Sequence, residues 1–236
     1  MSEALLSIEG LSKAFIIHQL GKRILACEGV DIRVGKGEFV GITGRSGSGK
    51  STVLKLVYRS YLPQEGRAIY LSERFGPIDL FRASDRQVIY LRRKEIGYVS
   101  QFLDLPPRTT AREAVEAAAV EIGMESEAAR EGCERMLRHF ELSEELWDSY
   151  VGTFSGGEKL RLNIARAMVK SPRLLLLDEP TASLDERSKL KVRELMLRMK
   201  AGGATMLGIF HDLQFMEGLC DREYAMGRGK LAERAC

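Results

Sequence analysis

The stretch Gly44-Arg45-Ser46-Gly47-Ser48-Gly49-Lys50-Ser51 decides the fold class of this chain of 236 residues. It fits the pattern G-x-x-x-x-G-K-[ST], in which glycines let successive backbone N–H groups turn inward around phosphate oxygens. The short apolar run Phe39–Thr43 before it is typical of a buried strand, and the residues from Ser51 onward have helical spacing. A strand, a glycine-rich loop and a helix in this order predict a loop that binds phosphate at the positive end of the helix.

The last side chains of this loop predict its chemistry. Lys50 is expected to reach the β- and γ-phosphates of a nucleotide, and the Ser51 hydroxyl to join the coordination shell of Mg²⁺. We include Thr52, the next residue, among the nucleotide-binding positions. The predicted phosphate-binding set is Gly44, Arg45, Ser46, Gly47, Ser48, Gly49, Lys50, Ser51 and Thr52.

The order of elements around the loop is that of an α/β protein. Ser7–Leu11 and Gly29–Val34 alternate apolar and polar residues, as half-exposed strands do. Leu174–Leu177 is a run of leucines, which is typical of a strand covered on both faces in a parallel sheet. Met206–Phe210 predicts a second buried strand after the amphipathic helix Glu186–Lys200.

A change of composition in the middle of the chain predicts the domain organisation. Thr110–Tyr150 is rich in Ala and Glu, contains no proline and has apolar residues at helical spacing. We therefore expect one domain, 1–236, with a helical subdomain at about 102–155 and a nucleotide-binding core from 1–101 and 156–236. The helix that follows the phosphate loop is expected to include Leu62, because Pro63 stops it.

Two carboxylates follow the leucine strand. Asp178 stands at the end of that strand and can hold Mg²⁺ through water, while Glu179 can direct an attacking water. Taken alone, an acidic turn after a strand is more often only a polar turn. A phosphate loop on the same sheet favours the catalytic interpretation, with Asp178 as the metal residue and Glu179 as the catalytic one.

The segment Phe154-Ser155-Gly156-Gly157-Glu158 distinguishes between classes of phosphate-loop protein. Ser155 and Glu158 form an S-x-x-E capping box, which predicts the start of a helix. A cap alone does not require glycines in the first helical turn, where they weaken the helix. Bare N–H groups at a helix start form an anion site, so a second phosphate-binding element is predicted here.

With these motifs the chain resembles the ATP-binding-cassette (ABC) ATPases, whose signature motif is L-S-G-G-Q. This sequence departs from it by Phe154 for Leu and Glu158 for Gln. The resemblance implies an α/β phosphate-loop NTPase with a mainly parallel central sheet, an N-terminal antiparallel β subdomain and an inserted helical subdomain. It also implies ATP and Mg²⁺ as ligands, and hydrolysis of ATP to ADP and phosphate.

The family pattern assigns roles to further residues. Gln101 resembles the glutamine that touches Mg²⁺ and the attacking water, and His211 resembles the histidine that contacts the γ-phosphate. Phe15 resembles the aromatic residue that stacks on adenine, although an apolar core position remains the alternative. The residues that the resemblance places against nucleotide held by a second subunit are Ser155, Gly156, Gly157, Glu158 and Asp185.

Four stretches narrow the resemblance to the ATPase subunit of the bacterial carbon–phosphorus lyase system, which degrades phosphonates. They are 12–19, 61–66, 98–103 and 208–212. The alternative is the ATPase subunit of a membrane transporter of the lipoprotein- or macrolide-export type. A small-molecule kinase outside the ABC family would not need the Ser155–Gly157 motif.

The expected partners follow from the same resemblance. They are a second ABC subunit, identical or paralogous, and either the lyase core subunits or a membrane permease. Both kinds of larger partner would use the surface around Gln101–Pro107, so that segment does not separate them.

Charge and composition exclude other classes. Lys and Arg number 36 against 33 Asp and Glu, a net charge of +3, which excludes a strongly basic nucleic-acid wrapper. A basic cluster at 82–94 is interleaved with acidic residues and lacks an aromatic stacking series, so it predicts a solvated helix face and no nucleic-acid binding. The longest stretch without Asp, Glu, Lys or Arg, Ala201–His211, is shorter than the ~18 residues of a membrane span.

The cysteines and the N-terminus predict the compartment. None of the four cysteines forms a C-x-x-C pair, and the first residues lack the basic and apolar blocks of a secretion signal. Free thiols in a reducing environment are the simplest interpretation. We therefore expect a cytoplasmic protein, peripheral to the inner membrane if it serves a transporter.

Overall fold

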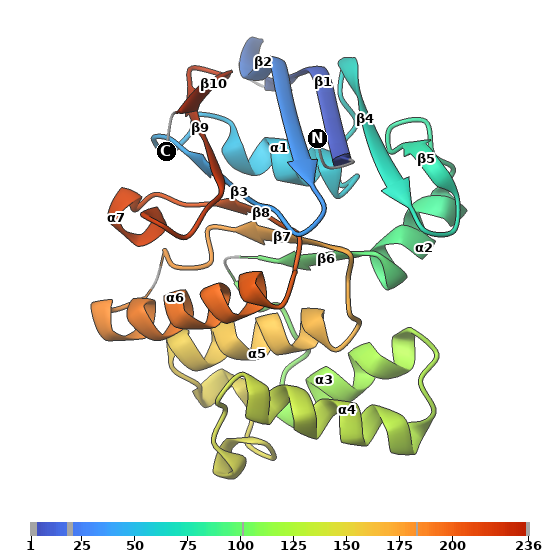
Figure 1. Ribbon diagram of the computed structural model, residues 1–236, viewed down its shortest axis with the longest axis vertical. Helices are drawn as coiled ribbons and strands as arrows, with labels where there is room; N and C mark the ends of the chain where they lie inside the picture. The colour runs from blue at the N-terminus through green and yellow to red at the C-terminus, as the bar shows by residue number, and fades with distance from the viewer. Residues whose placement is uncertain (1–3, 18–20, 101, 183, 235–236) are drawn as a thin grey trace.

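The computed structural model describes residues 4–17, 21–100, 102–182 and 184–234. Figure 1 shows a layered arrangement: one sheet at the top, a second sheet across the middle, and helices below it. Helix α1 (Lys50–Val57) lies between the two sheets. The protein is therefore an α/β structure with separate apolar cores above and below its central sheet.

The central sheet has the strand order β10-β9-β3-β8-β7-β6. Neighbouring strands from β9 to β6 run parallel, and β10 pairs with β9 in the antiparallel sense. The mainly parallel sheet is thus confirmed, while the hairpin of the last two strands was not predicted. The strands are β3 (Phe39–Thr43), β6 (Ile96–Val99), β7 (Leu174–Asp178), β8 (Met206–Ile209), β9 (Arg222–Gly227) and β10 (Lys230–Arg234).

Strand β7 lies in the interior of this sheet and is buried on both faces. Leu174 and Leu176 belong to the core between the two sheets, and Leu175 and Leu177 belong to the core on the helical side. This is the double coverage that the run of leucines predicted. It places Asp178 at the carboxyl end of a strand that packing holds from both sides.

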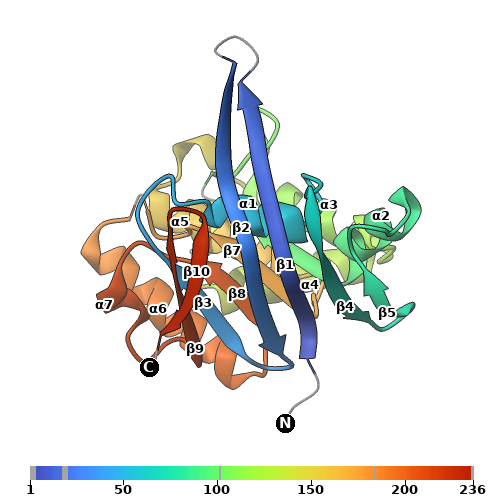
Figure 2. The ribbon, with the colours of Figure 1, turned by 90° about the horizontal axis from the view of Figure 1, so that it is seen from above.

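The upper sheet is antiparallel, with the strand order β2-β1-β4-β5. Val30, Ile32 and Val34 are buried, and the residues between them are exposed, as the alternation predicted. Figure 2 shows that the paired β1 and β2 extend well past the rest of the molecule at one end. The strands are β1 (Ala4–Ile17), β2 (Lys22–Gly35), β4 (Glu65–Ser72) and β5 (Gly76–Asp79).

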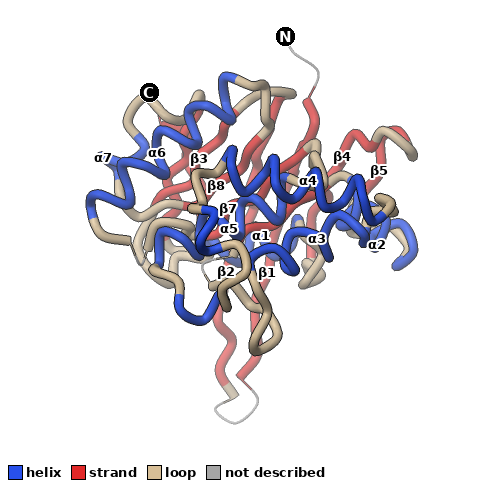
Figure 3. The backbone as a smooth tube through the Cα atoms, turned by 90° about the horizontal axis from the view of Figure 1, so that it is seen from below, coloured by secondary structure: helices blue, strands red, loops and turns tan. Residues whose placement is uncertain are grey.

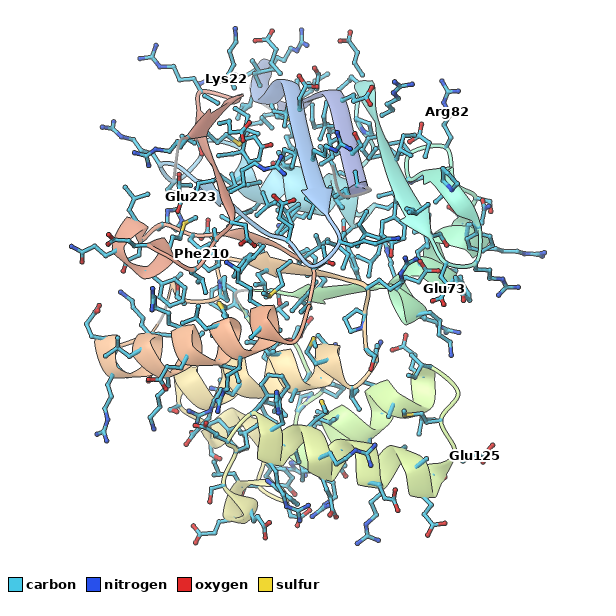
Figure 4. The ribbon with its side chains drawn as sticks, viewed as in Figure 1. Lys22, Glu73, Arg82, Glu125, Phe210 and Glu223 are labelled. Atoms are coloured by element: carbon cyan, nitrogen blue, oxygen red, sulfur yellow. The ribbon has the colours of Figure 1, made fainter. Side chains whose placement is uncertain are left out.

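Helices cover the other face of the central sheet (Figure 3). α5 (Gly156–Met168) and α6 (Glu186–Ala201) lie next to the sheet, and α3 (Ala111–Glu121) and α4 (Ser126–His139) pack against α5 farther out. The ring of Phe210 is fully buried between sheet and helices, whereas Arg82 and Glu125 point away from the molecule (Figure 4). Two further helices are α2 (Asp85–Lys94), which precedes β6, and the short α7 (Leu213–Met216).

Helix α1 ends earlier than expected. It stops at Val57 instead of reaching Leu62, which is 49% exposed. The reason is local: Arg59 has the left-handed φ of 68°, and the N–H of Ser60 donates to the carbonyl of Lys55. The left-handed residue and this hydrogen bond end the helix, so Pro63 is not the residue that stops it.

The expectations about the cysteines and about membrane-spanning segments can be compared with the described residues. Cys27 and Cys133 are free thiols, and they are buried, as is Cys220. Burial raises the pKa of the Cys27 thiol to about 11. Cys236 lies outside the described residues. None of the described helices combines the length and apolar composition needed to cross a bilayer.

Candidate active site

The phosphate loop is the turn between β3 and α1, and two of its glycines are sterically required. A Cβ on Gly44 would lie 2.2 Å from the carbonyl oxygen of Met226, and one on Gly49 would lie 1.8 Å from that of Ala26. Both residues also have positive φ angles, 144° and 107°, which side chains disfavour. Gly49 is the N-cap of α1, which has no side-chain cap and no acidic residue in its first turn. The loop therefore presents the positive end of a helix whose own first turn carries no acidic residue.

Lys50 is folded back over this loop. Its ammonium donates to the carbonyl oxygens of Gly44, at 2.9 Å, and Arg45, at 3.1 Å. The side chain is only 2% exposed, and burial lowers its pKa, while Glu179 and Asp178 act in the opposite direction. A buried ammonium with carbonyl partners and a carboxylate 3.8 Å away is suited to hold a polyanion.

Asp178 lies at the end of β7 and is 7% exposed. Its Oδ2 accepts a hydrogen bond of 2.6 Å from the phenol of Tyr98, at the end of the neighbouring strand β6. Burial, and then the bond to Asp178, raise the pKa of Tyr98, which keeps the phenol protonated as a donor. The other oxygen, Oδ1, is buried and has no hydrogen-bond partner among the described residues.

Glu179 lies between the phosphate loop and the end of strand β8. Its Oε1 lies 2.8 Å from Nε2 of His211, just past β8, and 3.8 Å from Nζ of Lys50. Its φ of 52° is unusual for a residue with a side chain, and more so for one that precedes a proline. Strained backbone of this kind persists where surrounding packing holds it, and it is concentrated at functional sites.

A second group of predicted residues lies at the starts of α5 and α6. The Ser155 hydroxyl caps the Glu158 N–H, and the Glu158 carboxylate accepts from the Ser155 N–H at 2.7 Å, so the predicted capping box is present. Asp185 caps α6 by accepting from the N–H of Ser188. A Cβ on Gly157 would lie 3.0 Å from Oγ of Ser188, so the two helix starts approach closely here and a side chain would require Ser188 to shift.

The comparisons with known proteins agree with these motifs. The sequence profile of the family described as ABC transporter matches residues 27–182. The chain is 34% identical over 235 residues to the lipoprotein-releasing system ATP-binding protein LolD of Legionella pneumophila strain Paris, covering 99% of this chain and 100% of the relative. The chain belongs to the ABC transporter family.

Other relatives show how far the likeness extends. The macrolide export ATP-binding/permease protein MacB of Wolinella succinogenes is 32% identical over 99% of this chain, which spans only 35% of that longer protein. The solved dimer of the ATP-binding cassette MJ0796, in a post-hydrolysis state with ADP and Pi, has a TM-score of 0.86 and 29% identity, covering 97% of each chain. This chain is thus an ABC ATPase that uses ATP and Mg²⁺ and releases ADP and phosphate, as predicted. The relatives named here belong to transport systems, so the lyase assignment stays a prediction.

The residues of this ABC ATPase fit a divalent cation. The buried Oδ1 of Asp178 lacks a partner among the described residues, and burying an unpartnered carboxylate oxygen is costly unless a ligand satisfies it. Ser51 follows Lys50 in the first turn of α1, and hydroxyl and carboxylate oxygens are donors that Mg²⁺ prefers. The hydroxyl of Ser48, inside the loop, is also buried without a partner among the described residues.

The remaining predicted residues lie apart or outside the description. Phe15, on β1, meets the ring of Tyr61 edge-on with centroids 5.3 Å apart, and Nζ of Lys13 lies 5.2 Å from its ring centroid. Gln101 falls outside the described residues. Tyr98 was not predicted as a site residue. The available signal was its place near the end of a strand that runs parallel to the one that ends in Asp178.

Proposed function

We propose that this chain is the ATP-hydrolysing subunit of a transport assembly and works as one half of a dimer closed by nucleotide. One observation carries the proposal. Lys50, Glu179 and His211 are joined within one chain, whereas no described hydrogen bond links Ser155 to any of them. Ser155 is exposed at the start of α5, where a second chain could present nucleotide to it.

Within one chain, the proposed roles follow from position and charge. Lys50 and the N–H groups of the loop would hold the phosphates, and Ser51 and Asp178 would hold Mg²⁺, with Thr52 beside them. The role of Gln101 as a further Mg²⁺ residue rests on the family resemblance alone. When bound, Mg²⁺ offsets the negative charge of the phosphates. Asp178 already stands at the strand end with one buried oxygen free among the described residues.

Glu179 would orient the attacking water and accept its proton. In the structure its carboxylate is held by His211 at 2.8 Å and lies near Lys50. A γ-phosphate would take over the attraction of Lys50, because its charge is greater than that of a carboxylate. His211 would then face the γ-phosphate on one side and Glu179 on the other.

The second half of the site would come from the partner chain. The N–H groups at the start of α5 and the hydroxyl of Ser155 form an anion site that opens outward. Two facing anion sites can share one γ-phosphate, so ATP would favour association and its hydrolysis would weaken it. The dimeric form of the related cassette MJ0796 supports this arrangement.

For the chain itself, we retain the proposed division into a core and a helical subdomain at about 102–155.

A surface beside the site would receive the larger partner. Phe102 is 70% exposed, and it lines a cavity of about 220 Å³ together with Leu103, Asn163 and Pro180. Pro180 directly follows Glu179, so a partner seated there would touch the segment that carries the catalytic residue. The names of the relatives support a membrane permease as that partner, and such a subunit would work at the cytoplasmic side of the membrane.

The second candidate partner is the core of a carbon–phosphorus lyase. Its support is the likeness of the stretches 12–19, 61–66, 98–103 and 208–212 to the ATPase subunit of that system. Affinity purification of the tagged chain from cells grown on phosphonate separates the two. Lyase subunits in the eluate support the second candidate, and a permease supports the first.

The dimer is tested by size. Glu179→Gln protein should run as a larger species with ATP than with ADP in size-exclusion chromatography with light scattering. Adding Ser155→Arg to Glu179→Gln should remove the larger species, because the bulky cation occupies the facing anion site. Equal sizes with ATP and ADP, alone and with a paralogous subunit, would contradict the shared site.

A further inference from the structure

The contact between Tyr98 and Asp178 goes beyond the roles described so far. Strands β6 and β7 lie side by side (Figure 1). Their register places Tyr98 opposite Leu176. The Tyr98 side chain reaches forward along the strand direction, and its phenol donates to Oδ2 of Asp178 at 2.6 Å. This bond involves one carboxylate oxygen only and leaves Oδ1 buried without a partner among the described residues.

The ring of Tyr98 packs against a second aromatic ring. Its centroid lies 4.8 Å from that of Tyr58, which follows α1. The guanidinium of Arg92, on α2, lies 4.7 Å from the ring centroid of Tyr58 and donates to its carbonyl oxygen at 2.8 Å. Arg92 on α2, the ring of Tyr58 and the ring of Tyr98 therefore pack one against the next, up to the Asp178 carboxylate at the end of β7.

We propose that Tyr98 is a positioning residue that fixes the Asp178 carboxylate and thereby presents Oδ1 to Mg²⁺. The inference rests on the proposed role of Asp178 as a metal residue. A carboxylate on a strand end can rotate about its last side-chain bond, and a charge-assisted hydrogen bond to one oxygen restricts that rotation. Partners of this kind around metal ligands commonly affect metal affinity 10- to 100-fold.

A purely structural role for Tyr98 makes a different prediction. If its hydroxyl only stabilised the fold, its loss would lower the unfolding midpoint and leave the affinity for a divalent cation unchanged. Tyr98→Phe separates the two roles, because it removes one oxygen and keeps the ring that packs on Tyr58. Tyr58→Phe is the matched control, since it removes a phenolic oxygen from the adjacent ring and leaves the bond to Asp178 in place.

The experiment measures Mn²⁺ binding by electron paramagnetic resonance in the Glu179→Gln background with ATP. Tyr98→Phe should weaken Mn²⁺ binding about 10-fold, and Tyr58→Phe should leave it unchanged. Binding of ATP in the presence of chelator should be the same in all of these proteins. The rise of the unfolding midpoint on adding Mg²⁺ and ATP is a second readout, and it should be smaller in Tyr98→Phe even if that variant starts from a lower midpoint.

Two outcomes would overturn the inference, and a third would overturn the proposed role of Asp178. Unchanged Mn²⁺ affinity and an unchanged ligand-induced rise in Tyr98→Phe would show that Tyr98 does not position Asp178. A similar loss in Tyr58→Phe would also overturn the inference, because ring packing would then explain the effect. Asp178→Ala tests the proposed function separately: if it binds Mn²⁺ as tightly as the parent protein, Asp178 is not a metal residue.

Discussion

The two anion-binding elements of this chain differ in how far they are completed by their own chain. Around the phosphate loop, Lys50 is buried, Glu179 lies against His211, and Asp178 bonds to Tyr98. At the start of α5, Ser155 is exposed, and its N–H and hydroxyl form hydrogen bonds with Glu158 of the same helix turn. The first element has the groups for chemistry, and the second has an open helix start. This difference is the basis of the proposal that one chain supplies the reacting groups and a second chain closes the site.

Removing the water-orienting carboxylate should have the largest effect. Glu179→Gln should reduce ATP turnover by at least about 100-fold, the scale of general-base catalysis, with ATP affinity retained. A coupled assay of phosphate release and an equilibrium binding measurement check the two parts. Glu127→Gln, on the exposed surface of α4, is the control and should keep full turnover. Retained turnover in Glu179→Gln would contradict the assignment of the reacting groups to this element.

Blocking the open element should stop hydrolysis without stopping nucleotide binding. Ser155→Arg should lose turnover while each chain still binds ATP, whereas Lys50→Ala should lose binding because the phosphate charges are uncompensated. In a homodimer, mixing these two inactive proteins restores one composite site, so the mixture should hydrolyse ATP. An ATPase assay on the mixture and on each protein alone provides the test. Full activity of Ser155→Arg in a monomeric preparation would show that one chain is sufficient.

A smaller effect is expected at the proposed base-binding residue. Phe15→Ala should weaken ATP binding by roughly 1 to 3 kcal/mol, the scale of base–aromatic stacking, and Phe15→Tyr should be nearly neutral. Isothermal titration calorimetry measures the affinity, and thermal unfolding measures the stability. The ring also packs edge-on against Tyr61. Lower stability with unchanged affinity would therefore favour the core role of Phe15 over the stacking role.

The smallest effect concerns the pH dependence of the capping box at the open element. The N–H of Ser155, and then its hydroxyl, hold the pKa of Glu158 below its usual range. The folded pKa is below the unfolded one, so the ionised box stabilises the fold above about pH 4 and loses this contribution as the pH falls through the folded pKa.

Glu158→Gln removes this titration and keeps an acceptor oxygen. The difference in unfolding midpoint between the parent protein and the variant should be on the order of 1 to 2 °C near neutral pH and should shrink towards about pH 3. Circular dichroism at several pH values measures it. A constant difference across the range would mean that the carboxylate charge does not contribute.

The sequence by itself determined the features that depend on neighbouring residues. The pattern Gly44–Ser51 predicted the phosphate loop, and Ser155 with Glu158 predicted a capping box that the structure contains. The run Leu174–Leu177 predicted a strand buried on both faces, because its composition leaves no polar face for solvent. Each of these rests on short-range geometry, in which spacing along the chain sets which groups meet.

The tertiary structure decided what depends on residues far apart in the sequence. The end of α1 was placed too late because Arg59 closes the helix in a left-handed conformation that its residue type does not predict. Glu179 meets His211, and Tyr98 meets Asp178, because parallel strands bring their carboxyl ends to one edge of the sheet. Strand order and register set these contacts. They arise from the packing of the whole sheet between its two cores, which no local pattern encodes.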